Sequence, residues 1–380
     1  MEILNYTKAH KDFRKKVREF LKKEVIPFAD LWEKDKIVPR EIWQKMGQAG
    51  FLSPTVPKEY GGPGLDLLYS IIIDEELAKT DQYGLFAPLH SDIIVPYIIT
   101  YGNEEQKKKY LPGCVSGDII TAVAMTEPGA GSDLAGMTAT AVENGDEIII
   151  NGSKTFISNG IHCDLVVLAL KDPAVENPHA AMSLYLVEDG TPGFSKGNKL
   201  NKMGMCSQDT AELFFTKCSI PKTNLLGEKG KGFYMLMAKL QQERLICSVM
   251  AVAAAEHMLK KTISFCKNNP VSGKPKSKSQ VNQFTIAELA TDIKIGRNFV
   301  NKLIADHMED KNVIIETSMA KYWTSDMAKR VADKCLDLHG RFATLEKCSL
   351  LRNWRDIRVM TIFAGTNEIM KGIIAKSMGL

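Results

Sequence analysis

Residues 124–133 read Ala-Met-Thr-Glu-Pro-Gly-Ala-Gly-Ser-Asp, and this stretch decides the fold because the chain changes character on either side of it. Its glycines, proline and small side chains predict a tight turn that exposes backbone N–H groups and hydroxyls. Such a turn can approach a flat or anionic ligand closely. A plain hairpin loop has the same composition, and on composition alone it is the more common structure.

The residues after this turn have the pattern of short strands. Runs rich in β-branched residues alternate with Asn-Gly and Gly-Asp pairs, which favour hairpin turns. We expect an antiparallel sheet or small barrel of about 100 residues. The expected strands include residues 148–150, 165–168, 182–187 and 213–215, and the expected turns lie at residues 144–145, 151–152 and 159–160.

Both flanks of this region have the apolar spacing of helices. In the first third, residues 67–77 and 93–99 are predicted to form buried helices. After Gly232 the strand pattern ends, and a long apolar helix is expected over residues 233–267. The predicted fold class is α+β, with a middle β unit at residues 121–231 between helical units at 1–120 and 232–380. Further C-terminal helices are expected at 283–309, 311–338 and 367–378.

The overall composition is that of an ordinary globular protein. The chain has 380 residues, with 49 Lys and Arg against 45 Asp and Glu, so its net charge is only +4. This balance does not favour a nucleic-acid binder. No apolar run reaches the length of a membrane span, and no export signal is visible, so the expected location is the cytoplasm. The 8 cysteines form no CxxC pair, and no metal site is predicted.

Five motifs occur in the order found in the acyl-CoA dehydrogenase family. The turn at 124–133 resembles that family's flavin-binding signature, and residues 154–160 resemble the strand beside the flavin ring. Residues 202–213 resemble the family's next strand, and residues 230–233 resemble the start of its long helix. Residues 364–370 resemble its C-terminal signature. The likeness covers nearly the whole chain.

This resemblance implies both a fold and a reaction. The family fold has an N-terminal α-helical domain, a middle β-barrel or sandwich domain and a C-terminal four-helix bundle. The implied cofactor is FAD, the substrate is an acyl-CoA thioester, as in β-oxidation, and the electrons pass to an electron-transfer flavoprotein. A homotetramer is expected, with a dimer as the alternative. The reaction is an α,β-dehydrogenation, in which a base removes the proton next to the thioester carbonyl.

The position of that base is the main departure from the family pattern. Most members carry a Glu before the Gly-Thr of the C-terminal signature, where this chain has Ala364. The isovaleryl-CoA and long-chain types carry it instead on the long helix before an Arg, and Glu243 followed by Arg244 matches that position. The resemblance therefore implies Glu243 as the catalytic base. A simple ion pair on the helix is the alternative for this residue.

Asp92 is a second candidate for the base. A few relatives that act on alicyclic thioesters use an Asp from this region, and such a base would imply a cyclohexene-type substrate. An N-cap for a helix beginning at Ile93 is the more ordinary interpretation of Asp92. A catalytically silent acyl-CoA-binding subunit is a further alternative.

The resemblance also implies the ligand contacts. For Thr126 and Ser158 turn capping is the alternative, and for Phe156 it is core packing. Ala364 is expected to contribute its backbone N–H, and the substrate contacts are expected at Ser132, Gln241 and Arg244. The expected cofactor contacts are Met125, Thr126, Gly131, Ser132, Phe156, Ser158, Gln280, Arg341, Ala364 and Thr366.

The adenosine half of the FAD site departs from the family pattern. The usual Arg and Phe are missing from residues 269–273, and a downstream Phe is replaced by Ser279, although Gln280 is retained. We expect Arg341 to supply the missing guanidinium, because Arg binds phosphate in a bidentate manner. Weakened cofactor binding is the alternative.

Overall fold

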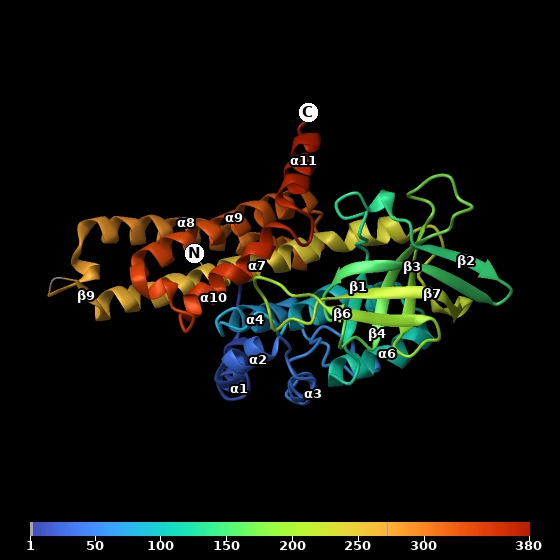
Figure 1. Cartoon of the computed structure of the whole chain (residues 1–380), viewed down its shortest axis with the longest axis horizontal. Helices are drawn as coiled ribbons and strands as arrows, with labels where there is room; N and C mark the ends of the chain where they lie inside the picture. The colour runs from blue at the N-terminus through green and yellow to red at the C-terminus, as the bar shows by residue number, and fades with distance from the viewer. Residues whose placement is uncertain (1–2, 272) are drawn as a thin grey trace.

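The computed structural model describes residues 3–271 and 273–380 and divides into helices, a sheet and helices again (Figure 1). Ser272, which belongs to the segment 269–273 that lacks the family's usual Arg and Phe, lies outside the described residues. The first part is helical and ends in a π-helical stretch, η3 (Leu89–Ile94), that leads directly into α5. Its helices are α1 (Lys8–Glu24), α2 (Ala29–Asp35), α3 (Glu41–Gln48), α4 (Leu67–Leu77), α5 (Val95–Tyr101) and α6 (Glu104–Ser116).

The middle part is a predominantly antiparallel sheet. Its strand order is β6-β7-β3-β2-β4-β5-β8, and β1 pairs with β4 in parallel. Alternation of apolar residues gives this sheet its own core, which contains Ile148, Ile150 and Leu213. The strands are β1 (Thr121–Ala124), β2 (Thr140–Asn144), β3 (Glu147–Ile157), β4 (Leu165–Lys171), β5 (Met182–Glu188), β6 (Phe194–Lys199), β7 (Ala211–Pro221) and β8 (Leu225–Leu226).

Two of the Asn-Gly pairs behave as predicted and one does not. Asn144-Gly145 forms the β2–β3 hairpin, and Asn159-Gly160 lies in the turn after β3. Asn151-Gly152 does not end a strand, so that prediction is wrong. It lies inside β3, where Gly152 has φ +144° and the register with β7 shifts. Gly152 provides a bulge here because a side chain would meet Ala139.

The last part is a bundle of long helices. The central helix α7 packs against α8 and α9, and it also packs against α4 of the first part. Two short strands, β9 (Pro270–Val271) and β10 (Lys274–Pro275), form the α7–α8 connection. The helices are α7 (Gly232–Asn268), α8 (Gln280–Met308), α9 (Ile314–His339), α10 (Ser349–Asp356) and α11 (Asn367–Ser377). The predicted α+β fold class and order of parts are confirmed.

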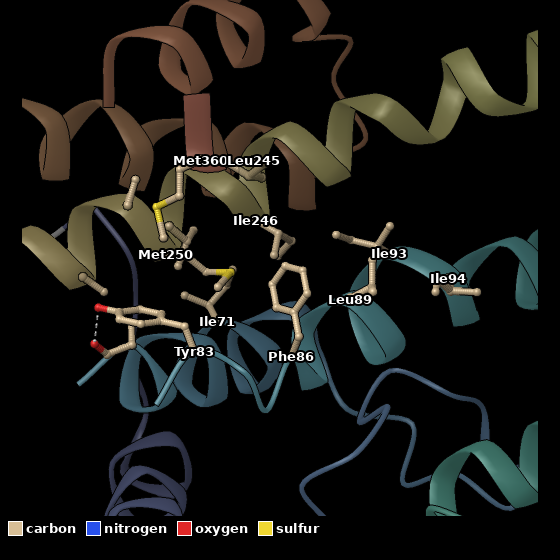
Figure 2. Packing of buried hydrophobic residues seen from close by; sticks show 14 of the residues in the cluster. Ile71, Tyr83, Phe86, Leu89, Ile93, Ile94, Leu245, Ile246, Met250 and Met360 are labelled. Atoms are coloured by element: carbon tan, nitrogen blue, oxygen red, sulfur yellow. Dashed lines mark hydrogen bonds between the residues drawn. The ribbon is translucent and has the colours of Figure 1, made fainter. Parts of the chain in front are cut away.

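The contact between α4 and α7 fixes the geometry of the site described below. Ile71 of α4 and Phe86 face Ile246 and Met250 of α7 in a continuous apolar cluster (Figure 2). Burial of each such side chain contributes about 1.5–3 kcal/mol. Glu243 lies one turn before Ile246, so this packing holds its carboxyl at the edge of the apolar cluster.

Among residues 3–271 and 273–380, no helix is both long enough and apolar enough to cross a membrane.

Candidate active site

Glu243 is a buried carboxyl on the central helix. Its residue exposure is 8%, and its Oε2 atom is buried without a hydrogen-bond partner among the described residues. Burial raises the pKa of Glu243 to about 7, although the charges of Arg244 and Lys321 oppose this rise. A carboxyl with such a pKa can exchange a proton near neutral pH.

The surroundings of Glu243 contain other polar atoms that no protein group satisfies. The Nε atom of Arg244 and the Oη atom of Tyr97 are buried without partners in the described part of the chain. Burial, together with the charge of Glu243, raises the pKa of the Tyr97 phenol. Unsatisfied buried donors and acceptors cost free energy in the protein alone, so this cluster fits a polar ligand that would supply the missing partners.

The two neighbours of Glu243 on α7 connect the site to other elements. Arg244 is buried and donates through Nη1 to Ser318 Oγ of α9 at 3.2 Å. Gln242 donates through Nε2 to the carbonyl oxygen of Asp92 at 2.7 Å. Residues one apart on a helix point about 100° away from each other. Glu243 is therefore placed between the η3 side and the α9 side of α7.

Gln241, which was predicted to contact the substrate, instead contacts other parts of the protein. Its side-chain nitrogen lies 2.9 Å from His307 Nδ1 and 3.2 Å from the Lys311 carbonyl, and its oxygen accepts from the Val313 N–H at 2.9 Å. These contacts hold the connection between α8 and α9. Substrate binding through Gln241 would require some of them to be given up.

Asp92 is not a helix N-cap, so that interpretation is wrong. It lies within η3, and α5 begins at Val95 without a side-chain cap. Asp92 is 3% exposed, and its Oδ1 has no partner in the described ranges. Burial raises the pKa of Asp92 to about 7. Asp74 of α4 is fully buried beside it, and burial and the charge of Asp92 raise the pKa of Asp74.

The C-terminal signature forms a turn in the left-handed region. Ala364 has φ +55° and Gly365 has φ +86°. The Thr366 hydroxyl accepts from the Ile369 N–H at 3.2 Å and so caps α11. Lys321 of α9 donates to the Gly365 carbonyl at 2.6 Å. The charge of Lys321 also lowers the pKa of Glu243, so the ammonium group that holds the signature turn is near the Glu243 carboxyl as well.

The glycine-rich turn and strand β3 are joined by a buried ion pair. Lys154 Nζ lies 2.8 Å from Glu127 Oε1 and also donates to the Met125 carbonyl at 3.0 Å. Both side chains are almost completely buried, and Glu127 also accepts from the Thr138 and Ala139 N–H groups. The predicted flavin contacts on the turn and on β3 are thereby held in one rigid unit.

The surface of this unit fits a flat cofactor. The Phe156 side chain is 67% exposed, which is unusual for a large apolar ring. Its backbone has φ +56°, a strained conformation for a residue other than glycine. Space around Gly129 and Gly131 is open to 4 Å, and Ser132 is exposed beside them. Ser158 follows β3 and is half-buried. The Thr126 carbonyl accepts from the Thr155 N–H at 2.9 Å, which brings the two flavin segments together.

The opposite end of the helical bundle has a basic groove that sequence reasoning did not predict. It has a volume of about 600 Å³ and is lined by Lys274, Lys276, Lys278 and Lys334. Gln280 is exposed at the start of α8. Arg341 is exposed on the stretch η7 (Gly340–Thr344), with its guanidinium over the Phe342 ring. Lys276 Nζ donates to the Leu338 carbonyl at 3.0 Å, just before that stretch.

Lys321 and Lys154 were also missed by the sequence reasoning. Lysine is rarely buried, so a lysine within a helix is normally assigned to the surface. For Lys321 a signal exists, because the buried positions Ala328 and Cys335 follow it at seven-residue spacing on the same helix face. In the described part of the chain, no group of three or more metal-binding side chains occurs.

Comparison with protein families decides the identity. The N-terminal, middle and C-terminal domain models of acyl-CoA dehydrogenases match residues 7–118, 122–218 and 230–379. This chain belongs to the acyl-CoA dehydrogenase family. The resemblance found in the sequence is thus confirmed, and so is the prediction that the chain is an enzyme of this family.

Individual relatives agree with the family assignment. The chain is 43% identical over 374 residues to a protein named long-chain specific acyl-CoA dehydrogenase, mitochondrial, from Rattus norvegicus, covering 98% of this chain and 87% of that protein. A structure of acyl-CoA dehydrogenase from Geobacillus kaustophilus is 52% identical, with a TM-score of 0.96 and coverage of 98% and 99%. A glutaryl-CoA dehydrogenase from Mycobacterium smegmatis in complex with FADH2 is 25% identical, with a TM-score of 0.92 and coverage of 99% and 95%.

Proposed function

We propose that this protein catalyses the FAD-dependent α,β-dehydrogenation of an acyl-CoA thioester, with Glu243 as the catalytic base. The observation that carries the proposal is the carboxyl of Glu243, which is buried, lacks a partner at Oε2 and has a pKa raised to about 7. A short branched, straight-chain or alicyclic acyl group is the proposed substrate class.

In this proposal the protein residues carry out the proton transfer. A thioester in the site displaces water, and ionised Glu243 takes the proton from the α-carbon. The electron pair left on the substrate moves toward the thioester oxygen. The N–H of Ala364 donates to that oxygen and stabilises the developing negative charge. The side chain of residue 364 takes no part, so alanine is compatible with this role.

The FAD group, when bound, accepts the hydride from the β-carbon. Met125, Thr126, Gly131 and Ser132 would lie along it, with Phe156 and Ser158 beside its ring. This assignment is supported by the exposed Phe156 ring and by the open space at Gly129 and Gly131. Thr366 would act through its place in the signature turn. Arg244 would contact the CoA part of the substrate.

For the adenosine half we propose a basic environment that includes Arg341 and Gln280. The lysine groove supports this proposal, since Lys276 donates to Leu338 close to Arg341. Comparison of R341A with K276A tests it, with FAD retention after gel filtration as the measurement. Unchanged retention in R341A would remove Arg341 from the proposal.

The assembly and the electron acceptor are further parts of the proposal. Val281, Phe284 and Ile295 are more than half exposed and lie on one face of α8. Such a face favours contact with a second copy, as in the expected homotetramer. An electron-transfer flavoprotein is the proposed acceptor, on the basis of family membership.

A second candidate function is dehydrogenation of an alicyclic acyl-CoA with Asp92 as the base. It is supported by the burial of Asp92 and by its unpartnered Oδ1 atom. A catalytically silent acyl-CoA-binding subunit is the third candidate, and it differs from both enzymes in the behaviour of its flavin.

The proposed function is tested by flavin absorbance. Purified protein is mixed anaerobically with linear, branched and cyclic acyl-CoA thioesters. We expect bound FAD to be bleached by at least one of them. A colourless protein that FAD cannot reconstitute, or a flavin that no thioester reduces, would support the silent subunit and contradict the proposal.

A further inference from the structure

Lys321 is a buried cation whose hydrogen-bond partners in the described part of the chain are neutral. It lies on α9 with an exposed fraction of 1%. Its ammonium donates to the Gly365 carbonyl at 2.6 Å and to Asn367 Oδ1 at 3.1 Å. Burying an ammonium group is unfavourable unless charge and hydrogen bonds compensate it. Such a group therefore indicates a role beyond packing.

The hydrogen bonds of Lys321 hold a turn that the backbone disfavours. Ala364 has φ +55°, and the left-handed region is unfavourable for a residue other than glycine. Asn367 helps to fix the turn, because it accepts from Ser325 Oγ at 3.1 Å and donates to Asp326 Oδ1 at 3.0 Å. The turn is thus tied to α9 at several points, and Lys321 is the one that binds its peptide carbonyl.

Glu243 and Lys321 lie on two helices, α7 and α9, that pack against each other. Arg244, next to Glu243, donates to Ser318 at 3.2 Å, and Ser318 lies one turn before Lys321, so the charge of Lys321 is near Glu243. Glu243 faces Arg244 and Cys247 from its own helix, Tyr97 from α5 and Lys321 from α9. Lys321 in turn faces Cys247, Arg244, Asp326 and Glu243. Burial lowers the pKa of Lys321 to about 8, so at neutral pH it remains mostly protonated.

We propose that Lys321 is a positioning residue that holds the Ala364–Gly365 turn in its left-handed conformation and keeps Glu243 ionised before proton transfer. This inference rests on the proposed function. During the transfer, the α-carbon C–H bond breaks and a Glu243 O–H bond forms. The negative charge moves from the carboxylate to the thioester oxygen beside the signature turn. Lys321 contacts that turn and acts on Glu243, so it is close to the negative charge at both stages.

The test separates the charge of Lys321 from its hydrogen bonds. K321Q keeps a donor for the Gly365 carbonyl and removes the charge, K321R keeps the charge, and S325A loosens the Asn367 clamp without changing any charge. Flavin reduction by a reactive acyl-CoA is measured against pH. We expect the acid limb of the profile to move up by about one pH unit in K321Q. In K321R and S325A the limb stays at its wild-type position, whatever the change in maximal rate.

A second readout does not depend on the flavin reaction. Infrared difference titration follows the protonated Glu243 carboxyl, identified as the band that is missing from E243Q. K321Q should shift its titration upward by the same amount as the kinetic limb. If K321Q lowers the rate but moves neither the limb nor the band, Lys321 is only structural and the inference is overturned. If K321Q does not fold, K321R is used instead. Because arginine keeps the charge, a shift in the titration of the Glu243 band in K321R would overturn the inference.

The two proposals fail in different ways. If no acyl-CoA reduces the wild-type flavin, the proposed function fails before any variant is compared. If the wild type reacts normally and the K321Q profile does not move, only the role of Lys321 is contradicted.

Discussion

Glu243 and Asp92 are two buried carboxyls on neighbouring elements, and burial raises the pKa of both. The groups around them are opposite in charge. Glu243 faces the cations Arg244 and Lys321, which partly oppose the effect of burial. Asp92 lies beside the buried carboxyl of Asp74. Burial thus raises both pKa values, but only the surroundings of Glu243 contain cations that support an ionised base.

The reason lies in how each site tolerates charge. When Glu243 is ionised, attraction to the neighbouring cations partly offsets the free-energy cost of removing the carboxylate from water. Ionised Asp92 would place a second negative charge near Asp74, and like charges in a buried site favour a shared proton. We therefore assign proton abstraction to Glu243 and regard the pair of aspartates as a neutral or singly charged unit.

The largest expected effect comes from removing each carboxyl in turn. E243Q should slow flavin reduction by about 10²–10⁴-fold, which is the usual contribution of a general base. D92N should stay within about threefold of the wild type, because Asp92 is not expected to take the proton. Stopped-flow measurement of flavin bleaching provides both numbers. The reverse ranking would favour Asp92 as the base and an alicyclic substrate.

The pH dependence of the wild type gives the next prediction. Glu243 must be ionised to accept a proton, and its pKa is about 7. The rate of flavin reduction should therefore rise with pH through about 7 and level off above it. D92N should retain this limb. A limb that disappears in D92N would mean that Asp92, rather than Glu243, controls the reaction.

Stability should respond to Asp92 in a pH-dependent way. Burial raises its pKa on folding, so the folded state keeps a proton that the unfolded state releases. The free energy of unfolding should therefore fall as the pH rises above about 4, where an unfolded aspartate ionises, until the raised pKa of the buried group is passed. D92N removes this loss, and its gain over the wild type should grow between pH 4 and pH 8, by about 1.4 kcal/mol for each unit by which folding raises the pKa.

Denaturant unfolding at several pH values measures that gain. E243Q is the matched comparison, and its gain should be smaller, because it leaves Arg244 and Lys321 as buried cations without an opposing charge. A gain for D92N that is constant with pH would show that Asp92 is ionised in the fold.

The smallest effect is expected at the position where the usual acid is absent. A364G should change flavin reduction by less than about threefold, since only the backbone N–H of this residue has a role. Glycine adopts φ +55° without strain, so the free energy of unfolding should change by no more than about 1 kcal/mol. A large loss of rate at normal stability would instead assign a role to the Ala364 methyl group.

Much of the fold could be predicted from the sequence, because its apolar patterns are strong. The helix predicted over 233–267 was found at Gly232–Asn268, and the predicted order of parts was found. Strand β6 was not predicted, since its sequence FSKGNK is polar and mostly half-buried or exposed. The break at Asn151-Gly152 was predicted wrongly because an Asn-Gly pair can also form a bulge.

The candidate site was predictable only where motifs carried it. Glu243 followed from its position before Arg244, but its lack of a partner is a property of three-dimensional packing. The burial of Asp74, Lys154 and Lys321 could not be predicted, because charged residues are normally placed at the surface. The N-cap predicted at Asp92 is wrong because the sequence does not reveal that η3 continues into α5 without a break.

The most direct test of Glu243 as the base follows proton transfer alone. With the bound flavin reduced beforehand, hydride transfer cannot proceed, and the α-proton of a bound saturated acyl-CoA can still exchange with D₂O. Mass spectrometry measures the deuterium gained. We predict exchange in the wild type and in D92N, and loss of exchange in E243Q. Exchange in E243Q at the wild-type rate would contradict the assignment of Glu243.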